Sequence, residues 1–226
     1  MLESRTPPKH VAMDLEGVAK WAEQHQVPLQ EAYQLSFHHI YAFIEHQAML
    51  NVPVITFFVT SPSMRGTLQG DAVLAELVDF LNNNTTRELF SHHKMKVTVL
   101  GKWYDLPQPV VEAVRRVSEE TRAYDSFFVN FCLNYDGQEE IVDACKVIAR
   151  LVKLSKIDPD MITKDVMKEN LATSYFIPPD IIIRNGARQM TTSLLLWDSP
   201  GAYIIFSGKL FPELSVADFL GMIQRR

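Results

Sequence analysis

Unbroken apolar runs alternate along this chain with stretches in which apolar residues recur at three- and four-residue steps. The runs are of the kind that a sheet covered on both faces requires, so they predict strands. The periodic stretches are typical of amphipathic helices. The strands expected on this basis are His10 to Leu15, Val52 to Thr60, Met95 to Leu100, Phe127 to Leu133 and Ile181 to Ile183.

Helices are expected between these strands. They cover Val18 to His25, Pro28 to Leu50, Asp71 to Phe90 with an interruption near Asn82 to Asn84, Leu106 to Tyr124, Glu139 to Leu154 and Thr163 to Thr173. Regular alternation of strands and helices predicts an α/β fold with a mostly parallel sheet. No repeat and no second composition regime interrupts the pattern, so we expect one domain over residues 1–226, with residues 1–9 flexible.

Composition narrows the class of protein further. The 226 residues are 47% hydrophobic and 22% charged, which is ordinary for a globular protein. The net charge of −5 argues against nucleic acid as a partner. No apolar segment reaches the roughly 18 residues of a membrane span, and the N-terminus has no signal-peptide core. We therefore expect a cytoplasmic protein with at most peripheral membrane contact, in which Cys132 and Cys145 are buried, reduced thiols.

The end of the last predicted strand carries a candidate functional residue. Ile181 to Ile183 lead into Arg184-Asn185-Gly186, and Asn-Gly is typical of a tight turn. In open α/β sheets, ligands bind beyond the carboxyl ends of the strands. Arg184 at that place suits a phosphate-bearing ligand, and the alternative is an arginine paired with a nearby carboxylate.

The C-terminal stretch resembles the undecaprenyl diphosphate synthase family, the cis-prenyltransferases. That family has Ile-Arg-Thr-Gly-Gly, a Leu-Leu-Trp run, an Ala-Glu-Leu-Tyr-Phe strand and a Phe-Pro or Trp-Pro turn. The matching pieces here are Ile183 to Gly186, Leu195 to Trp197, Ala202 to Phe206 and Leu210 to Pro212. Ser199-Pro200 and Ala217 to Phe219 are more similar to the branch that makes irregular, lavandulyl-type diphosphates. The resemblance implies a sheet of about six strands and a homodimer.

The resemblance extends to the N-terminal loop, where the family reads His-Ile-Ala-Ile-Ile-Met-Asp-Gly-Asn-Gly-Arg-Trp-Ala. Without gaps, Glu16 falls on the Asp that carries Mg²⁺ in the family, Gly17 on the Gly and Lys20 on the Arg. Glutamate is still a hard oxygen ligand, but its extra methylene displaces the carboxylate, and Mg²⁺ demands near-ideal octahedral geometry. The resemblance thus implies a weakened Mg²⁺ site at Glu16. Asp14 is a rival candidate two residues away.

The resemblance assigns roles to further residues. It implies catalytic roles for Glu16, Arg184 and Asn134, the last of which opens the motif Asn134-Tyr135-Asp136-Gly137. It implies a diphosphate site and a substrate pocket as well. The expected diphosphate-binding residues are Gly17, Lys20, Arg65, Arg184, Arg188 and Thr192, and the expected pocket residues are Trp21, Tyr33 and Tyr203.

Several parts of the family pattern are missing. The second Arg of the family's Arg-x-Ser is Met190, the Glu of its Ala-Glu-Leu-Tyr-Phe strand is Tyr203, and the Asn beside the metal-binding Asp is Val18. The chain ends in Arg225-Arg226 without the Arg-x-Gly that completes a partner's site in the family. The pocket for isopentenyl diphosphate is therefore more altered than the allylic one, which argues against a standard long-chain enzyme.

Three hypotheses are compatible with these residues. The first is an enzyme that ionises an allylic prenyl diphosphate and couples or cyclises it to a short irregular product, with Arg188 compensating for Met190. The second is a non-catalytic partner subunit of a two-component cis-prenyltransferase. The third is an interaction module with a vestigial pocket.

Overall fold

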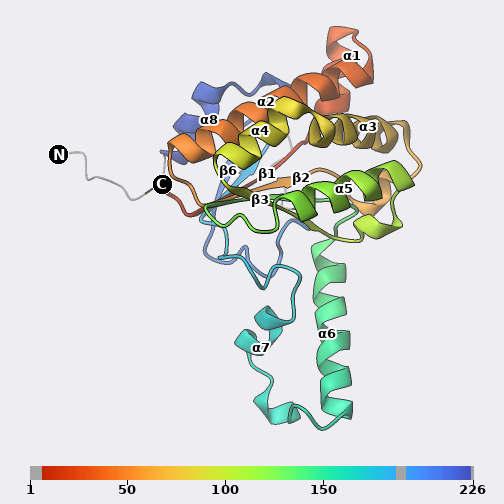
Figure 1. The fold of residues 1–226 in the computed structure, drawn as a ribbon, viewed down its shortest axis with the longest axis vertical. Helices are drawn as coiled ribbons and strands as arrows, with labels where there is room; N and C mark the ends of the chain where they lie inside the picture. Colours follow the sequence, from red (N-terminus) through yellow and green to blue (C-terminus); the bar gives the residue numbers. More distant parts are fainter. Residues whose placement is uncertain (1–6, 187–191, 225–226) are drawn as a thin grey trace, which may run out of the picture.

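The computed structural model describes residues 7–186 and 192–224, and its centre is a six-stranded sheet. Every strand pair is parallel, so the expected, mostly parallel sheet of about six strands is confirmed (Figure 1). The spatial order is β3-β4-β2-β1-β5-β6. The strands are β1 (His10–Asp14), β2 (Val54–Phe58), β3 (Met95–Leu100), β4 (Phe127–Cys132), β5 (Ile181–Arg184) and β6 (Tyr203–Phe206).

Among the described residues, seven of the eight helices fall where apolar periodicity places them, although the last of these ends at Glu169 and not at Thr173. The helix Val216–Ile223 was not predicted. The expected interruption of the helix near Asn82 to Asn84 is a break between two helices, with Asn83 capping the second through Thr85 N. The helices are α1 (Val18–His25), α2 (Leu29–Met49), α3 (Leu68–Asn82), α4 (Asn84–His92), α5 (Gln108–Glu120), α6 (Gly137–Lys153), α7 (Lys164–Glu169) and α8 (Val216–Ile223). Among the described residues, no helix is long and apolar enough to cross a membrane.

Apart from the edge strand β6, the sheet is covered on both faces because its strands alternate between two apolar layers. In β1, Val11 and Met13 belong to the large cluster formed with α2, α3, α5 and α8, and Ala12 belongs to a smaller one. The smaller cluster is closed by Phe176, Leu194 and Leu195, which lie in the connections before β5 and before β6. Continuous apolar strands are the sequence signature of such two-sided burial.

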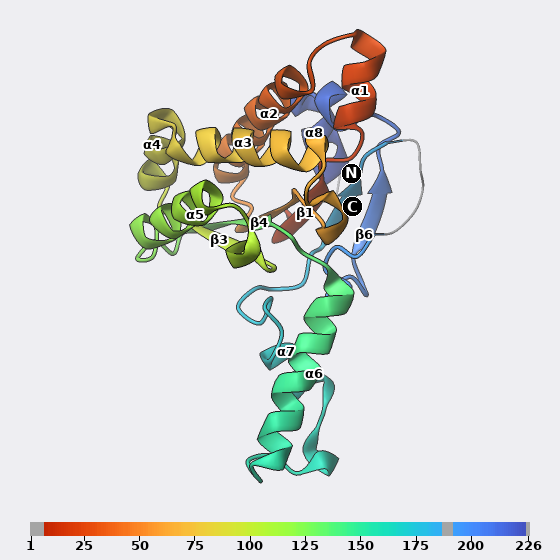
Figure 2. The ribbon, with the colours of Figure 1, turned by 90° about the vertical axis from the view of Figure 1, so that its right-hand side faces the viewer.

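A helical arm projects from this body. Helix α6 extends away from the sheet, and the chain returns beside it through α7 (Figures 1 and 2). Cys145 is exposed on α6, so the expectation that both cysteines are buried was wrong for Cys145 and right for Cys132. The prediction failed because an amphipathic helix is expected to have one face covered by the sheet. Helix α6 instead projects away from the sheet.

Two sets of polar contacts fasten the arm at its base. The carboxylate of Glu140 in α6 accepts hydrogen bonds from the Tyr135 hydroxyl at 2.6 Å and from the Thr173 N–H at 3.0 Å. Lys168 in α7 lies 2.8 Å from both carboxylate oxygens of Asp198. The arm is thus tied both to the end of β4 and to the segment that precedes β6.

Three buried polar side chains, those of His10, Thr56 and Asn130, are hydrogen-bonded to one another across β1, β2 and β4. His10 Nδ1 lies 2.7 Å from the Ile177 carbonyl oxygen, and Nε2 lies 2.8 Å from Thr56 Oγ1. Because a carbonyl can only accept, the Nδ1 atom carries the proton and Nε2 accepts from the Thr56 hydroxyl. Thr56 Oγ1 in turn accepts from Asn130 Nδ2 at 3.1 Å. Burial lowers the pKa of His10 to about 4.

The buried, neutral His10 predicts a pH dependence of stability. The unfolded chain protonates this imidazole near pH 6.5, whereas the folded chain resists protonation down to about pH 4. The folded state therefore loses stability as the pH falls through that window. We expect the free energy of unfolding of the wild type to fall by on the order of 2 kcal/mol more than that of His10→Gln between pH 7 and pH 4.5.

Urea unfolding of both proteins at the two pH values measures this difference. All other titrating groups, Asp14 included, are common to the two proteins and cancel. Parallel pH profiles would show that His10 is protonated in the folded protein.

Candidate functional site

The carboxyl ends of β1 and β5 meet where the strand order reverses. The chain passes from β1 to β2 on one side, while β5 and β6 lie on the other side of β1. Such a reversal leaves a crevice beyond the strand ends, where open α/β sheets bind ligands. Asp14 is the last residue of β1 and Arg184 the last of β5, so the two side chains face each other at the crevice.

The Arg184 guanidinium is held between two carboxylates. Nη1 forms an ion pair with Asp14 Oδ2, a contact without hydrogen-bond geometry, and donates to Thr192 Oγ1 at 2.8 Å. Nη2 lies 3.2 Å from Glu16 Oε2. The arginine thus has the carboxylate pairing that was one of the two interpretations of its sequence, and binding of an anion by Arg184 stays a prediction.

Asp14 joins the ends of the two strands. Its Oδ1 accepts the backbone N–H of Glu16 at 3.2 Å and that of Asn185 at 3.1 Å. Its carbonyl oxygen accepts from the Asn185 side-chain amide at 2.5 Å. Burial raises the pKa of the Asp14 carboxyl to about 6, although Arg184 and the two N–H donors act in the opposite direction.

The turn at Glu16 and Gly17 is braced by the chain that follows β6. Gly17 has φ of +90°, and a Cβ on it would lie 2.5 Å from Leu210 Cδ2. The Phe211 N–H donates to the Glu16 carbonyl at 3.0 Å, and the Gly186 N–H donates to that of Lys209 at 2.7 Å. Gly17 is therefore required by its backbone conformation and by close packing, and α1 begins at the next residue.

The expected cations Lys20 and Arg65 are both exposed. Lys20 lies in the first turn of α1. Arg65 follows β2 and lines a cavity of about 350 Å³ with Thr60, Asp71 and Leu106. Arg184 lines a different and smaller cavity, of about 110 Å³, with Thr192, Leu194 and Ser199. Lys20 is thus in α1, Arg65 is in the connection after β2 and Arg184 ends β5. Their convergence on one diphosphate stays a prediction.

Asn134 lies at the end of β4. It adopts φ of +47° and is buried. Its N–H donates to Thr60 Oγ1 at 2.8 Å, and its Nδ2 donates to the Lys102 carbonyl at 3.0 Å. These contacts fix the loops after three adjacent strands, and the catalytic role expected for Asn134 stays a prediction.

The remaining predicted residues lie in different surroundings. Trp21 is half-buried and stacks on His25 with 4.2 Å between ring centroids. Tyr33 is buried in α2, and burial raises its pKa to about 12. Tyr203 is exposed on the edge strand β6. Arg188, with Met190, lies outside the described residues.

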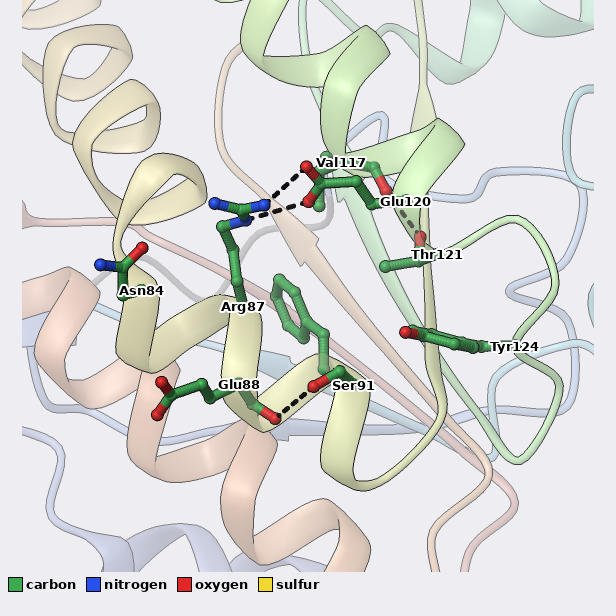
Figure 3. A pocket seen from close by; sticks show the side chains of 9 residues that line it. Asn84, Arg87, Glu88, Ser91, Val117, Glu120, Thr121 and Tyr124 are labelled. Atoms are coloured by element: carbon green, nitrogen blue, oxygen red, sulfur yellow. Dashed lines mark hydrogen bonds and ion pairs between the residues drawn. The ribbon is translucent and has the colours of Figure 1, made fainter.

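A further cavity, of about 420 Å³, is remote from the crevice. It lies between α4 and α5 and is bordered by Tyr124, which precedes β4, so it sits at the amino edge of the sheet (Figure 3). Two of its three charged residues, Arg87 and Glu120, are joined by two hydrogen bonds of 3.0 and 2.7 Å, and the third is Glu88. Size alone therefore does not identify the functional site in this fold.

Sequence reasoning gave Asp14 only the role of a rival metal ligand and missed its role as the anchor of Arg184. The available signal was an acidic residue that directly follows an apolar strand, at a position where the family motif has Ile. Asn185 was also missed, because its contact with Asp14 joins residues 171 positions apart.

Comparison with known proteins finds one family model and several relatives that match nearly the whole chain. Residues 13–225 match the model of a family described as putative undecaprenyl diphosphate synthase. The tritrans,polycis-undecaprenyl-diphosphate synthase (geranylgeranyl-diphosphate specific) of Pyrococcus horikoshii is 28% identical over 225 residues, which cover 99% of this chain and 85% of the relative. Cis-prenyltransferase 4, chloroplastic, of Solanum lycopersicum is 25% identical, with 94% and 70% covered.

A solved structure is similar over nearly the whole chain. It is lavandulyl diphosphate synthase from Lavandula x intermedia in complex with dimethylallyl diphosphate, which is 26% identical. Its TM-score is 0.92, and the match covers 97% of this chain and 94% of the other.

The packing of Gly17 yields a stability prediction. We expect Gly17→Ala to lower the free energy of unfolding by about 2–4 kcal/mol, because a positive φ and overpacking against Leu210 act together. Gly66→Ala is the matched control, since Gly66 has φ of +68° but a Cβ on it would have nothing within 4 Å. It should cost about 1 kcal/mol. Equal losses in urea unfolding would show that Leu210 moves aside freely.

Proposed function

The chain belongs to the family described as putative undecaprenyl diphosphate synthase, and on that premise we propose that it binds and ionises an allylic prenyl diphosphate. The product is a short irregular or cyclic isoprenoid. The observation that carries this proposal is Arg184 beside Glu16 at the reversal of strand order, on a fold that superposes on a lavandulyl diphosphate synthase bound to dimethylallyl diphosphate.

Ionisation sets the charge requirement of the site. As the allylic C–O bond breaks, its electron pair goes to the diphosphate and a carbocation remains on the hydrocarbon. Fixed cations beside the leaving group stabilise the charge that develops there, which is commonly the largest contribution to catalysis. In this chain Arg184 supplies the buried cation, Lys20 supplies an exposed one from the first turn of α1, and Arg65 supplies another from the connection after β2.

The carbocation is then quenched by an electron-rich acceptor. With Met190 and Thr192 in place of the family's Arg-x-Ser, a second diphosphate of the isopentenyl kind lacks one of its cations. The acceptor is therefore another allylic double bond, an internal double bond or water, and a proton is lost in the final step. Tyr203 stands where the family has Glu, so this chain also lacks the second carboxylate that the family has near the metal.

Mg²⁺ fits this site only through Glu16. Mg²⁺ is commonly held by one or two carboxylates together with substrate phosphate oxygens and water. Among the described residues no cluster of three or more metal-binding side chains occurs, and Asp14 is buried against Arg184. Glu16, whose side chain is 37% exposed, would hold the ion, which when bound would offset part of the diphosphate charge.

A partner-subunit function is the second candidate. The exposed, separated positions of Lys20 and Arg65 favour it, because a second chain could be needed to bring cations onto the ligand. The missing carboxylate at Tyr203 and the Val18 replacement favour it too. In that case the chain alone has no activity on any of these substrates, and it raises the activity of a second cis-prenyltransferase.

Product analysis tests the enzymatic proposal. The protein is incubated with dimethylallyl, geranyl or farnesyl diphosphate, with and without isopentenyl diphosphate and Mg²⁺, and the products are identified by mass spectrometry after phosphatase treatment. We expect a short product that Glu16→Ala and Arg184→Lys abolish. Loss of a charge-assisted contact at Arg184 should weaken diphosphate binding by about 1.5–3 kcal/mol.

The control for this experiment is Arg122→Lys, because Arg122 is exposed and forms its ion pair with the neighbouring Glu119, at 3.5 Å. It should leave the product unchanged. A ladder of long polyprenols would contradict the altered acceptor pocket, and activity that requires a second family member would establish the partner-subunit function.

We further propose that the chain assembles as a homodimer, or as a heteromer with a second cis-prenyltransferase subunit. Large apolar side chains are exposed on the arm and on the edge strand β6, and a surface of this kind is typical of a protein–protein interface. The exposed residues are Val142, Val147, Leu154, Met161 and Ile162 on the arm, and Tyr203, Ile204 and Phe206 on β6.

A charge on this surface should prevent assembly. We expect sedimentation to give a dimer for the wild type and a monomer for Leu154→Glu, because a buried, unpaired carboxylate is costly at an interface. Leu68→Glu, at another exposed leucine at the start of α3, should leave the dimer intact. A monomeric wild type that dimerises only with a second family member would favour the heteromer.

A further inference from the structure

We propose that Arg184 has one permanent and one exchangeable counter-ion: Asp14 stays on the guanidinium, and the Glu16 carboxylate is displaced from it by the diphosphate of the ligand. This inference rests on the proposed function, and it specifies how the diphosphate site is held before the ligand binds. In the protein without ligand, Glu16 occupies the place of a phosphate oxygen.

The two carboxylates differ in burial. The Asp14 and Arg184 side chains are each 3% exposed, whereas that of Glu16 is 37% exposed. Separating a fully buried ion pair leaves two charges away from water and is costly. In the part-buried Arg184–Glu16 pair the carboxylate can move into solvent and stay hydrated. Displacement of Glu16 therefore takes much less free energy than displacement of Asp14.

The hydrogen bonds differ in the same sense. The Asp14 carboxylate is held by two backbone N–H groups, from Glu16 and Asn185, besides the guanidinium. The Glu16 carboxylate accepts its hydrogen bond from Arg184 Nη2. The main chain of Glu16 is fixed by Phe211 and Asp14, so its side chain can swing away while the turn that carries it stays in place.

The charge balance also favours exchange over simple addition. Asp14, Glu16 and Arg184 together carry one negative charge, which repels an incoming diphosphate. If a phosphate oxygen replaces Glu16 on Nη2, the guanidinium keeps two anionic partners and the repelling carboxylate moves toward solvent. Glu16 then lies beside the bound diphosphate, where a carboxylate and phosphate oxygens can share a divalent cation.

If Glu16 is displaced by the ligand, removing its charge should strengthen the binding of a diphosphate. If Glu16 simply helped to bind the ligand, removing its charge should weaken binding. Isothermal titration with inorganic pyrophosphate is carried out in the presence of a chelator, so that no metal contributes. We expect Glu16→Gln to bind pyrophosphate about two- to fivefold more tightly than the wild type, because the ligand no longer displaces an ion pair whose carboxylate partner is partly in solvent. Glu23→Gln, which removes the same charge from the exposed face of α1, should leave the affinity unchanged.

A crystal structure with pyrophosphate tests the permanent partner. We expect Arg184 to keep its contact with Asp14 and the Glu16 carboxylate to have left Nη2. An unchanged or weaker affinity of Glu16→Gln, or a guanidinium that has left Asp14, would overturn the exchange while the diphosphate site stands. Absence of binding by both proteins would overturn the exchange and the diphosphate site together.

Discussion

A buried ion pair between neighbouring strand ends is the constraint on which this site depends. Placing the charges of Asp14 and Arg184 out of contact with water is unfavourable unless each is compensated nearby. The compensation comes from Glu16, Thr192 and the backbone N–H of Asn185. Consequently the turn after β1 at Glu16 and the residue that follows β5, Asn185, are held in one arrangement relative to each other, and Gly17, Leu210 and Phe211 pack beside them.

The sequence predicted most of the fold because two-sided burial leaves a strong local signal. Apolar runs identified β1 to β5, whereas β6 was expected only from the family resemblance. Glu16-Gly17 and Asn185-Gly186 identified the turns at the site. It could not predict which carboxylate pairs with Arg184, since that depends on the parallel register of β1 and β5. The sequence also led to a wrong prediction for the burial of Cys145. Periodicity indicates that a helix has an apolar face, but it does not indicate whether that face packs against the sheet.

The base of the arm and the candidate site share one segment of chain. Thr192, Leu194 and Ser199 border the small cavity at Arg184, and Asp198 in the same segment holds Lys168 of α7. The arm and the surroundings of Arg184 are therefore joined by one short segment of chain. Such a connection is compatible with both an enzyme and a subunit that acts through a partner.

The unequal exposure of the two cysteines gives the chain a built-in reporter. Cys132 is sealed in the sheet, whereas Cys145 projects from the outer arm. A thiol-reactive fluorophore or spin label would therefore attach at one position of the unaltered protein. Its emission or its distance to a second label would follow assembly through the arm, without any change to the residues that surround Arg184.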